Sequence, residues 1–372
     1  MLKKLSFLVV VLALVATACG DDDSATTTTG GATTTVAPTT GDGGQAEGGI
    51  LQQVQDRGVL RCGVSGSATA FSELQPDGNV TGFDADYCRY VAAAVLGDSN
   101  AVEFTALTAA ERFTAVQTGA VDVLIRNTTW TQSRDTDVGM DFAPTTYYDG
   151  QQVMARAADG FSPTSGIEDL EGAVVCTNAG TTTEKNITEV TQSLGVTIEL
   201  TTFEDFDQVM AGFLSGACDA VTTDGSGLVG RKATQEAEDR DGSEWAIFPP
   251  SPISKEPLGP VTIQNDSQWR DVVTWAVFSS IIFDEKGVTA ANAADMAANS
   301  EDGEVLRLLG TGEDQLQSAM GLEPDAWLNA VSQVGNYDEI YSRNLNPVGL
   351  FREGSLNASF VDGGLIYAPP AR

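Results

Sequence analysis

The sequence predicts an α/β protein of two lobes, each built on a mostly parallel sheet with flanking helices. The part of the chain with a globular composition runs from about residue 50 to 372, roughly 320 residues, which is longer than the size at which one hydrophobic core usually stops growing. Within it, short apolar strands alternate with helical patterns, and the same order of elements occurs twice in succession.

The first unit begins with an apolar strand over 59–64 and a helical pattern over 85–96. A strand at 102–107, a helix from 109 to about 117 and a strand at 121–125 follow. Strands that alternate with helices in this way are typical of a largely parallel sheet with helical crossovers.

The second unit repeats this plan. Its predicted elements are a strand at 173–177, a helix at 184–194, a strand at 197–200, a helix at 203–214 and a strand at 220–223. The helix-to-strand joints agree as well, since residues 117–122 read QTGAVD and residues 214–219 read LSGACD. Open sheets bind ligands at the carboxyl ends of their strands, so two such units predict a cleft between two sheet edges.

The N-terminus has the pattern of a secretory signal peptide. Two lysines precede an apolar run over 5–15, which is shorter than the roughly 20 residues that a membrane-spanning helix needs. Small residues then lead to Cys19, an arrangement that resembles the lipobox of lipoproteins, in which this cysteine carries the lipid. We therefore predict a signal peptide over 1–18 and a lipidated Cys19; secretion with cleavage near Ala18 and no lipid is the alternative.

Residues 19–49 have the composition of a disordered tether, because Asp21-Asp22-Asp23 leads into a stretch of Thr, Gly and Ala with almost no large apolar side chains. Three adjacent aspartates do not converge on a metal by themselves, so we interpret them as a solvated spacer. No metal site and no cofactor is predicted.

Composition excludes two function classes. With 52 acidic and 20 basic residues the formal charge is −32, which excludes nucleic acid as a partner, since phosphates require a basic surface. The absence of histidine rules out Ser–His and His–zinc chemistry and argues against an enzyme. An anionic ligand is still permitted, because one local arginine outweighs a diffuse field that salt screens.

Five segments, in order, resemble the type II periplasmic solute-binding proteins of family 3, and among them the general L-amino-acid binders. They are GFDAD at 82–86, RNTTWTQSRD at 126–135, GTTTE at 180–184, SKEPLGP at 254–260 and GLIYAPP at 364–370. The resemblance implies a two-lobed type II periplasmic-binding-protein fold with a two-strand hinge. Lobe 1 is then expected over 50–148 and again over 258–372, which includes a C-terminal helical extension, and lobe 2 over 149–257.

The resemblance also implies a free L-amino acid as the ligand. Arg134 matches the position that binds the ligand carboxylate, a task suited to the planar fork of a guanidinium. Asp224 matches the carboxylate that binds the ligand ammonium. The alternatives are a surface ion pair of Arg134 with Asp135 or Asp137, and a helix-capping role for Asp224.

Four polar residues complete the implied site. Thr181 and Thr182 lie between a strand and a helix, where backbone N–H groups favour an anion, and Thr182 is expected to contact the ligand carboxylate. A helix N-cap is the plainer role for this segment. Asn127 and Thr129 match positions that help to hold the carboxylate and ammonium groups.

Three further positions bear on the pocket wall. Phe71 matches an aromatic residue near the wall, whereas Ala68 stands where some basic-amino-acid binders carry a stacking ring, which implies a less selective pocket. Trp130 is expected either to cover the ligand as a lid or to pack, half-buried, near the hinge.

Four cysteines remain once Cys19 is set aside for lipid, in a location that is oxidising. Their placement on elements of each implied lobe pairs Cys62 with Cys88 and Cys176 with Cys218. Buried free thiols are the alternative.

Together these features imply the substrate-binding lipoprotein of an amino-acid ABC importer. A monomer is expected on the outer face of the bacterial cytoplasmic membrane, held there by its N-terminal lipid. It would close around a broad range of L-amino acids and deliver them to the transmembrane subunits of a permease. An enzyme on the same fold, resembling cyclohexadienyl dehydratase with Glu184 or Asp224 in proton transfer, and a ligand-sensing lipoprotein are the alternatives.

Overall fold

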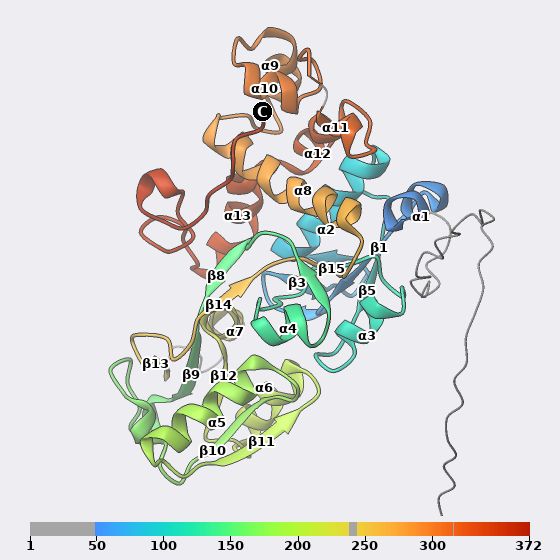
Figure 1. The fold of residues 1–372 in the computed structure, drawn as a ribbon. Coiled ribbons are helices and arrows are strands. Elements are labelled where there is room, and N and C mark those ends of the chain that lie inside the picture. The colour runs from blue at the N-terminus through green and yellow to red at the C-terminus, as the bar shows by residue number, and fades with distance from the viewer. Residues whose placement is uncertain (1–48, 238–243, 315) are drawn as a thin grey trace, which may run out of the picture. The chain divides into compact units, whose positions relative to one another are not determined.

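Two five-stranded sheets organise the computed structural model, which describes residues 49–237, 244–314 and 316–372 (Figure 1). The first sheet has the order β5-β1-β6-β15-β7 and the second β11-β10-β12-β9-β13. In each sheet four strands point the same way and one, β15 or β9, is reversed. The predicted signal peptide, Cys19 and all of the predicted tether except Gly49 lie outside the described residues.

The first sheet and its helices are called lobe 1 below, and the second sheet with its helices lobe 2. The strands of the first sheet are β1 (Leu60–Val64), β5 (Val102–Ala106), β6 (Val123–Leu124), β7 (Met140–Phe142) and β15 (Val261–Ile263). Those of the second sheet are β9 (Gln151–Arg156), β10 (Val174–Asn178), β11 (Glu199–Phe203), β12 (Ala220–Asp224) and β13 (Trp245–Phe248). A small sheet in lobe 1 contains β2 (Ser67–Ala68), β3 (Ser72–Leu74) and β4 (Val80–Thr81).

Helices cover both sheets. Lobe 1 carries α1 (Ile50–Arg57), α2 (Phe83–Leu96), α3 (Arg112–Gln117), α4 (Gln132–Thr136), α8 (Ser267–Glu285), α9 (Ala293–Asn299), α10 (Gly303–Leu308), α11 (Leu316–Ala319), α12 (Ala326–Val334) and α13 (Tyr337–Leu345). Lobe 2 carries α5 (Thr182–Leu194), α6 (Phe206–Ser215) and α7 (Gly225–Ala237). No helix in the described ranges combines the length and apolar character that crossing a membrane requires.

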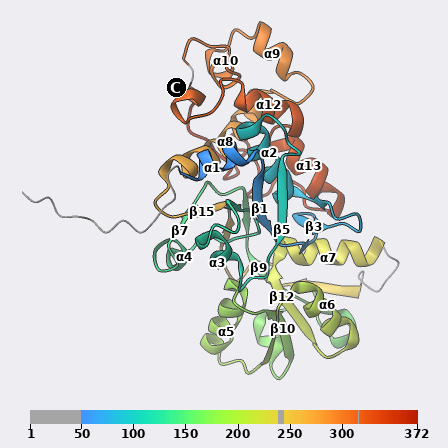
Figure 2. The same cartoon turned by 90° about the vertical axis from the view of Figure 1, so that its right-hand side faces the viewer.

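Alternation along the strands explains why each sheet is covered on two faces. In β10, Val175 packs in one apolar cluster with Ile187 of α5, whereas the next residue, Cys176, packs in another cluster with Phe213 of α6. Figure 2 shows α5 and α6 on either side of this sheet. Because both faces of β10 are buried, this strand begins with a continuous apolar run, Val174-Val175-Cys176.

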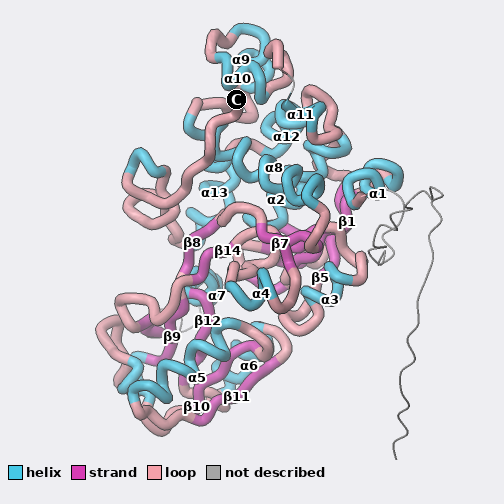
Figure 3. The backbone as a smooth tube through the Cα atoms, in the orientation of Figure 1, coloured by secondary structure: helices cyan, strands magenta, loops and turns pink. Residues whose placement is uncertain are grey.

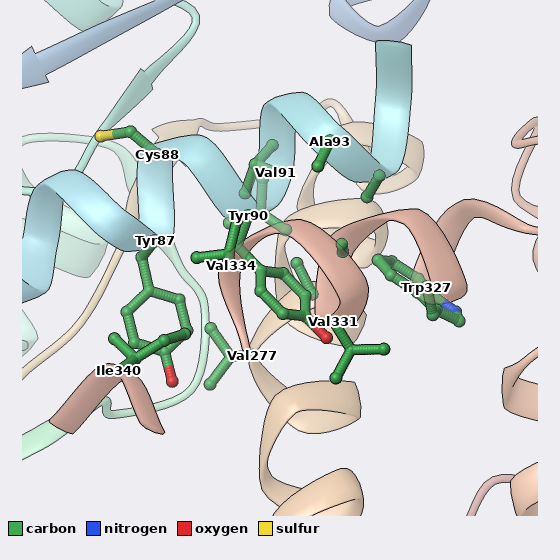
Figure 4. Packing of buried hydrophobic residues seen from close by; sticks show 14 of the residues in the cluster. Tyr87, Cys88, Tyr90, Val91, Ala93, Val277, Trp327, Val331, Val334 and Ile340 are labelled. Carbon is green, nitrogen blue, oxygen red and sulfur yellow. The ribbon is translucent and has the colours of Figure 1, made fainter. Parts of the chain in front are cut away.

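The core of lobe 1 is dominated by helices that pack on α2. Figure 4 shows Tyr87 and Tyr90 of α2 among apolar side chains of α8, α12 and α13. Each buried tyrosine retains a hydrogen-bond partner, since the Tyr87 hydroxyl lies 3.0 Å from Ser280 Oγ and that of Tyr90 lies 3.1 Å from Ser279 Oγ. The long C-terminal helical region therefore completes the core of the first lobe.

The repeated joint between helix and strand has one physical function in both lobes. In lobe 1, Asp122 accepts a hydrogen bond of 2.8 Å from the backbone N–H of Arg61 at the start of β1. In lobe 2, Asp219 accepts one of the same length from Val174 at the start of β10. Each aspartate thereby fixes the beginning of an equivalent strand, β1 in lobe 1 and β10 in lobe 2, which accounts for the parallel sequences QTGAVD and LSGACD.

The helix predicted from 203 begins later. Phe203 is the last residue of β11, and Asp205 caps the helix by accepting a 2.8 Å hydrogen bond from the N–H of Gln208. The capping side chain thus sets the start of α6, which the apolar pattern alone did not locate.

Two short strands join the large sheets. β8 (Tyr147–Asp149) and β14 (Glu256–Leu258) pair antiparallel, and Figure 3 shows them side by side between the two sheets. The chain passes through β8 before the second sheet and through β14 after it, which is the two-strand hinge expected for this fold.

Both predicted disulfides are present. Cys62 of β1 is bonded to Cys88 of α2, and Cys176 of β10 is bonded to Cys218, which immediately precedes β12. Each bond ties a strand to a neighbouring segment of its own lobe, and disulfides of this kind stabilise a fold by about 2–4 kcal/mol.

Candidate ligand-binding site

A pocket of about 90 Å³ lies where the strands of both sheets end. Its lining residues follow the carboxyl ends of β1, β5, β6, β10 and β12, which is where open α/β sheets bind ligands. They are Ser65, Ser67, Ala68, Thr69, Arg112, Arg126, Asn127, Thr129, Arg134, Asn178, Thr181, Thr182, Thr183, Phe206, Thr223, Asp224, Ser226, Gly227 and Arg231. Six of the eight predicted ligand-binding residues are among them: Asn127, Thr129, Arg134, Thr181, Thr182 and Asp224.

The loop after β6 is held in place by Asp84. Its carboxylate accepts a 2.9 Å hydrogen bond from the N–H of Asn127, whose φ of 42° lies in the left-handed region. Gly82 permits this arrangement, because at its φ of 125° an added Cβ would lie 2.3 Å from the carbonyl oxygen of Phe71. Burial raises the pKa of Asp84 to about 7, while the hydrogen bond from Asn127 and the charge of Arg126 oppose the rise.

Arg134 lies on the short helix α4, which Thr131 caps by accepting a hydrogen bond from the Arg134 N–H at 3.3 Å. The side chain is 7% exposed, and its Nη1 donates to the carbonyl oxygen of Thr129 at 2.8 Å. Burial lowers the pKa of the guanidinium. Within the described ranges Arg134 forms no ion pair with Asp135 or Asp137, so its charge is directed at the pocket.

Asp224 ends β12 and faces the pocket from lobe 2. Its Oδ1 is buried, and no described residue donates a hydrogen bond to it. Burial raises the pKa of this carboxyl well above its usual range, and the nearby carboxylates Asp149 and Glu256 raise it further. A cationic donor at this position would satisfy the oxygen and favour the ionised form.

Two more carboxylates lie behind Asp224 at the hinge. Asp149 accepts a hydrogen bond from the Ser226 hydroxyl, and burial raises its pKa to about 6. Glu256 accepts a 2.6 Å hydrogen bond from Thr129 of lobe 1 and a 2.8 Å bond from Asn186 of lobe 2. These acidic groups make the hinge side of the pocket its negative pole; in the parts of the chain that the structure describes, no cluster of three or more candidate ligands is arranged to hold a metal.

The N-terminus of α5 closes the lobe 2 side. Thr181 is its N-cap and accepts a 3.1 Å hydrogen bond from the N–H of Glu184. Thr182 Oγ1 lies 3.4 Å from Thr129 Oγ1, so the two lobes meet across the pocket. The helix has 13 residues, and its terminus adds partial positive charge to the wall that these threonines form.

Arg112 and Arg126 are pocket residues that were not predicted. Arg112 is the first residue of α3, which follows β5, and Arg126 follows β6 by two residues. A signal existed, because a basic residue placed just after a predicted parallel strand lies at the sheet edge where ligands bind. Burial lowers the pKa of both guanidiniums, that of Arg126 to about 10.

Phe71 and Trp130 are not brought into the pocket. The Phe71 ring is buried in lobe 1, edge-on to Phe83 and Tyr147 at 5.9 and 5.2 Å between centroids. The Trp130 side chain stacks on Phe142 at 5.5 Å and the residue is 42% exposed, while the backbone N–H of Trp130 donates to the Pro257 carbonyl. Apolar packing determines the place of both rings, and the structure assigns neither one to the wall.

Comparison with known proteins decides the family. The model of the bacterial extracellular solute-binding proteins, family 3, matches residues 60–186. The general L-amino acid-binding periplasmic protein AapJ of Rhizobium johnstonii is 42% identical over 87% of this chain and 92% of its own length. The chain belongs to the solute-binding proteins of family 3. The glutamate/glutamine/aspartate/asparagine-binding protein BztA of Rhodobacter capsulatus is 40% identical over 88% of this chain and 95% of its own.

Solved structures of binding proteins share this fold. A periplasmic binding protein of an ABC transporter from Brucella ovis, with glutathione bound, superimposes with a TM-score of 0.81 at 40% identity, covering 88% of this chain and all of the other. An ancestral arginine-binding protein bound to arginine, 24% identical with a TM-score of 0.53, shares the fold over 62% of this chain and 95% of its own. The type II periplasmic-binding-protein fold predicted from the sequence is confirmed. The relatives named here are binding proteins, and this chain is a binding protein and not an enzyme.

Proposed function

We propose that this family 3 protein captures free L-amino acids outside the cytoplasm and delivers them to the permease of an ABC importer. One observation carries the proposal: a single pocket is lined by the buried guanidinium of Arg134 from one lobe and by the carboxyl of Asp224, whose Oδ1 is buried, from the other. A zwitterionic head group has one charge of each sign, so it complements this pair. AapJ and BztA, whose names state that they bind amino acids, align with this chain over 92% and 95% of their own lengths.

The ammonium is assigned to the hinge side. Asp224 Oδ1 and Asn127 Oδ1 are both buried without a donor among the described residues, and both belong to the pocket lining. An unsatisfied buried acceptor costs about 1–3 kcal/mol, so a ligand that donates to both removes a penalty that the free protein carries. Thr129 completes this side through its bond to Glu256.

The carboxylate is assigned to Arg134, with the N-terminus of α5 approaching from the other lobe. A guanidinium binds a carboxylate with two parallel hydrogen bonds, and backbone N–H groups at Thr181 and Thr182 favour the same charge. The ligand carboxylate alone would thus contact both lobes. Such contacts exist only when the lobes are closed, which makes ligand binding a shift of population toward closure.

Closure can be measured directly. We expect saturating ligand to reduce the radius of gyration in small-angle X-ray scattering of the protein without residues 1–48, because the open form lacks contacts such as that between Thr129 and Thr182. An unchanged radius of gyration under conditions where calorimetry shows saturation would contradict closure.

The N-terminal region places the protein at the membrane surface in this proposal. A signal peptide over 1–18 and lipid on Cys19 would leave residues 19–49 as a tether to the outer face of the cytoplasmic membrane, where a permease would meet the closed form. The predicted monomer suits this role, because one pocket is formed by one chain.

Glutathione is a second candidate ligand. The Brucella ovis protein that shares 40% of its sequence with this chain was solved with glutathione bound. Glutathione ends in a γ-linked glutamate, so it presents the same ammonium and carboxylate pair.

Isothermal titration calorimetry tests the proposal. The protein without residues 1–48 is unfolded, freed of carried-over ligand by dialysis and refolded, and then titrated with the twenty amino acids and with glutathione. We expect micromolar or tighter binding of several L-amino acids. If no amino acid bound detectably to protein that thermal unfolding shows to be folded, the proposal would be overturned. Binding of glutathione alone would establish the second candidate.

A further inference from the structure

Positive charge is concentrated in the pocket of a chain that is otherwise strongly acidic. The sequence has 52 acidic and only 20 basic residues, yet the pocket lining contains four arginines and a single carboxylate, that of Asp224. The four arginines are Arg112, Arg126, Arg134 and Arg231.

Three of these arginines have an interaction that accounts for them. Arg134 is assigned to the ligand α-carboxylate under the proposed function. Arg231 forms an ion pair with Asp207 and donates a 2.6 Å hydrogen bond to a backbone carbonyl of lobe 1. Arg126 donates at 2.8 Å to the Leu107 carbonyl, and the buried carboxyl of Asp84 is its main electrostatic partner.

Arg112 forms no hydrogen bond or close ion pair with any described residue, although Asp224 attracts it from beyond ion-pair distance. It is 3% exposed, and its Nε is buried without a hydrogen-bond acceptor. No carboxylate of the described residues lies within ion-pair distance of its guanidinium. The side chain packs on Phe113, 4.9 Å from the ring centroid, and Arg134 approaches the same ring at 5.4 Å. A buried charge that lacks a partner costs several kcal/mol, so the pocket is built to receive an additional anionic group near this guanidinium.

The surroundings of Arg112 identify the kind of ligand. Glu256 and Asp224 both act on Arg134, whereas Asp224 is the one carboxylate that acts on Arg112 among the described residues, against the like charges of Arg134 and Arg126. A neutral zwitterion adds no anion beside Arg112, whereas an amino acid with a second carboxylate can form an ion pair with it. We infer that Arg112 is a specificity residue for a second carboxylate and that the protein prefers dicarboxylic amino acids, glutamate and aspartate, over their amides; this inference rests on the proposed function.

One other arrangement uses the same residues. Arg112 and Arg134 would then share the α-carboxylate, which every amino acid has. The two arrangements differ in what Arg112 distinguishes: a second-carboxylate site separates glutamate from glutamine, and a shared α-carboxylate site does not.

The test compares L-glutamate with L-glutamine, and L-aspartate with L-asparagine, by calorimetry on the wild-type protein and on Arg112→Gln. The members of each pair differ by one charge at nearly equal size. We expect the wild type to bind the acid about 10–100-fold more tightly than the amide, and Arg112→Gln to reduce this ratio to about one. Arg112→Lys, which keeps the charge without the planar fork, is expected to retain part of the preference.

Arg270→Gln is the matched control, because Arg270 lies on the surface of α8 with a side chain that is 43% exposed. Thermal unfolding of each variant verifies the fold. Equal wild-type affinity for acid and amide overturns the inference and leaves the proposed function standing. An equal loss of both ligands in Arg112→Gln also overturns it, in favour of the shared α-carboxylate. Failure of the proposed function is distinguishable, since then neither member of a pair binds.

Discussion

Replacing Arg134 by alanine is expected to weaken amino-acid binding by about 10²–10³-fold, or roughly 3–4 kcal/mol. The reason is that the ligand carboxylate loses the two parallel hydrogen bonds from the Arg134 guanidinium. It is then a buried anion held by the N-terminus of α5 alone. The loss is expected for every amino acid that binds, whatever its side chain, because all share the α-carboxylate. Calorimetry on the ligand-free protein measures it.

Two further variants make the result interpretable. Arg134→Lys keeps the charge but not the two parallel hydrogen bonds, so its affinity is expected to lie between those of alanine and arginine. Arg270→Ala removes a surface arginine and should bind normally. If Arg134→Ala, shown by circular dichroism to be folded, retained wild-type affinity, the assignment of the α-carboxylate would be wrong.

The unfolding free energy of the ligand-free protein is expected to depend on pH through Asp84. Burial raises the pKa of this carboxyl from 3.8 to about 7, so between these values the folded protein holds a proton that the unfolded chain releases. Each unit of pH rise in that window therefore lowers the unfolding free energy by about 1.4 kcal/mol, a loss of about 4 kcal/mol in all. The contribution is fully present below pH 3.8 and is lost as the pH rises through 7.

Asp84→Asn isolates this effect, because the amide has no titrating proton and its oxygen still accepts the N–H of Asn127. Urea unfolding of both proteins between pH 4.5 and 7.5 is compared, and the variant is expected to gain stability relative to wild type as the pH rises. Asp271→Asn, at an exposed position on α8, should follow the wild type. Parallel curves for wild type and Asp84→Asn would contradict the raised pKa.

Much of this architecture could be predicted from residue patterns. Helical and strand periodicities predicted a helix at 85–96, within two residues of the bounds of α2, and placed most strands within a few residues. The parallel joints at Asp122 and Asp219 predicted two equivalent units, and their hydrogen bonds to the starts of β1 and β10 explain why the pattern recurs. The two disulfides followed from the placement of the cysteines within each lobe.

The pocket lining was harder to predict, because it depends on packing between residues distant in sequence. Phe71 and Trp130 are aromatic residues close in sequence to residues that line the pocket. Their rings pack on Tyr147 and Phe142 and do not line it. Arg112 was missed because an arginine at the start of a short helix ordinarily faces solvent. Only the tertiary structure shows that it is buried beside Arg134, with no carboxylate of the described residues within ion-pair distance.

A crystal structure of the protein with its tightest-binding amino acid tests the central claim most directly. We predict that the ligand lies between the lobes, with its α-carboxylate on Arg134 and the N-terminus of α5 and its ammonium on Asp224. A ligand bound outside this pocket, or with its ammonium far from Asp224, would contradict the proposed mode of capture.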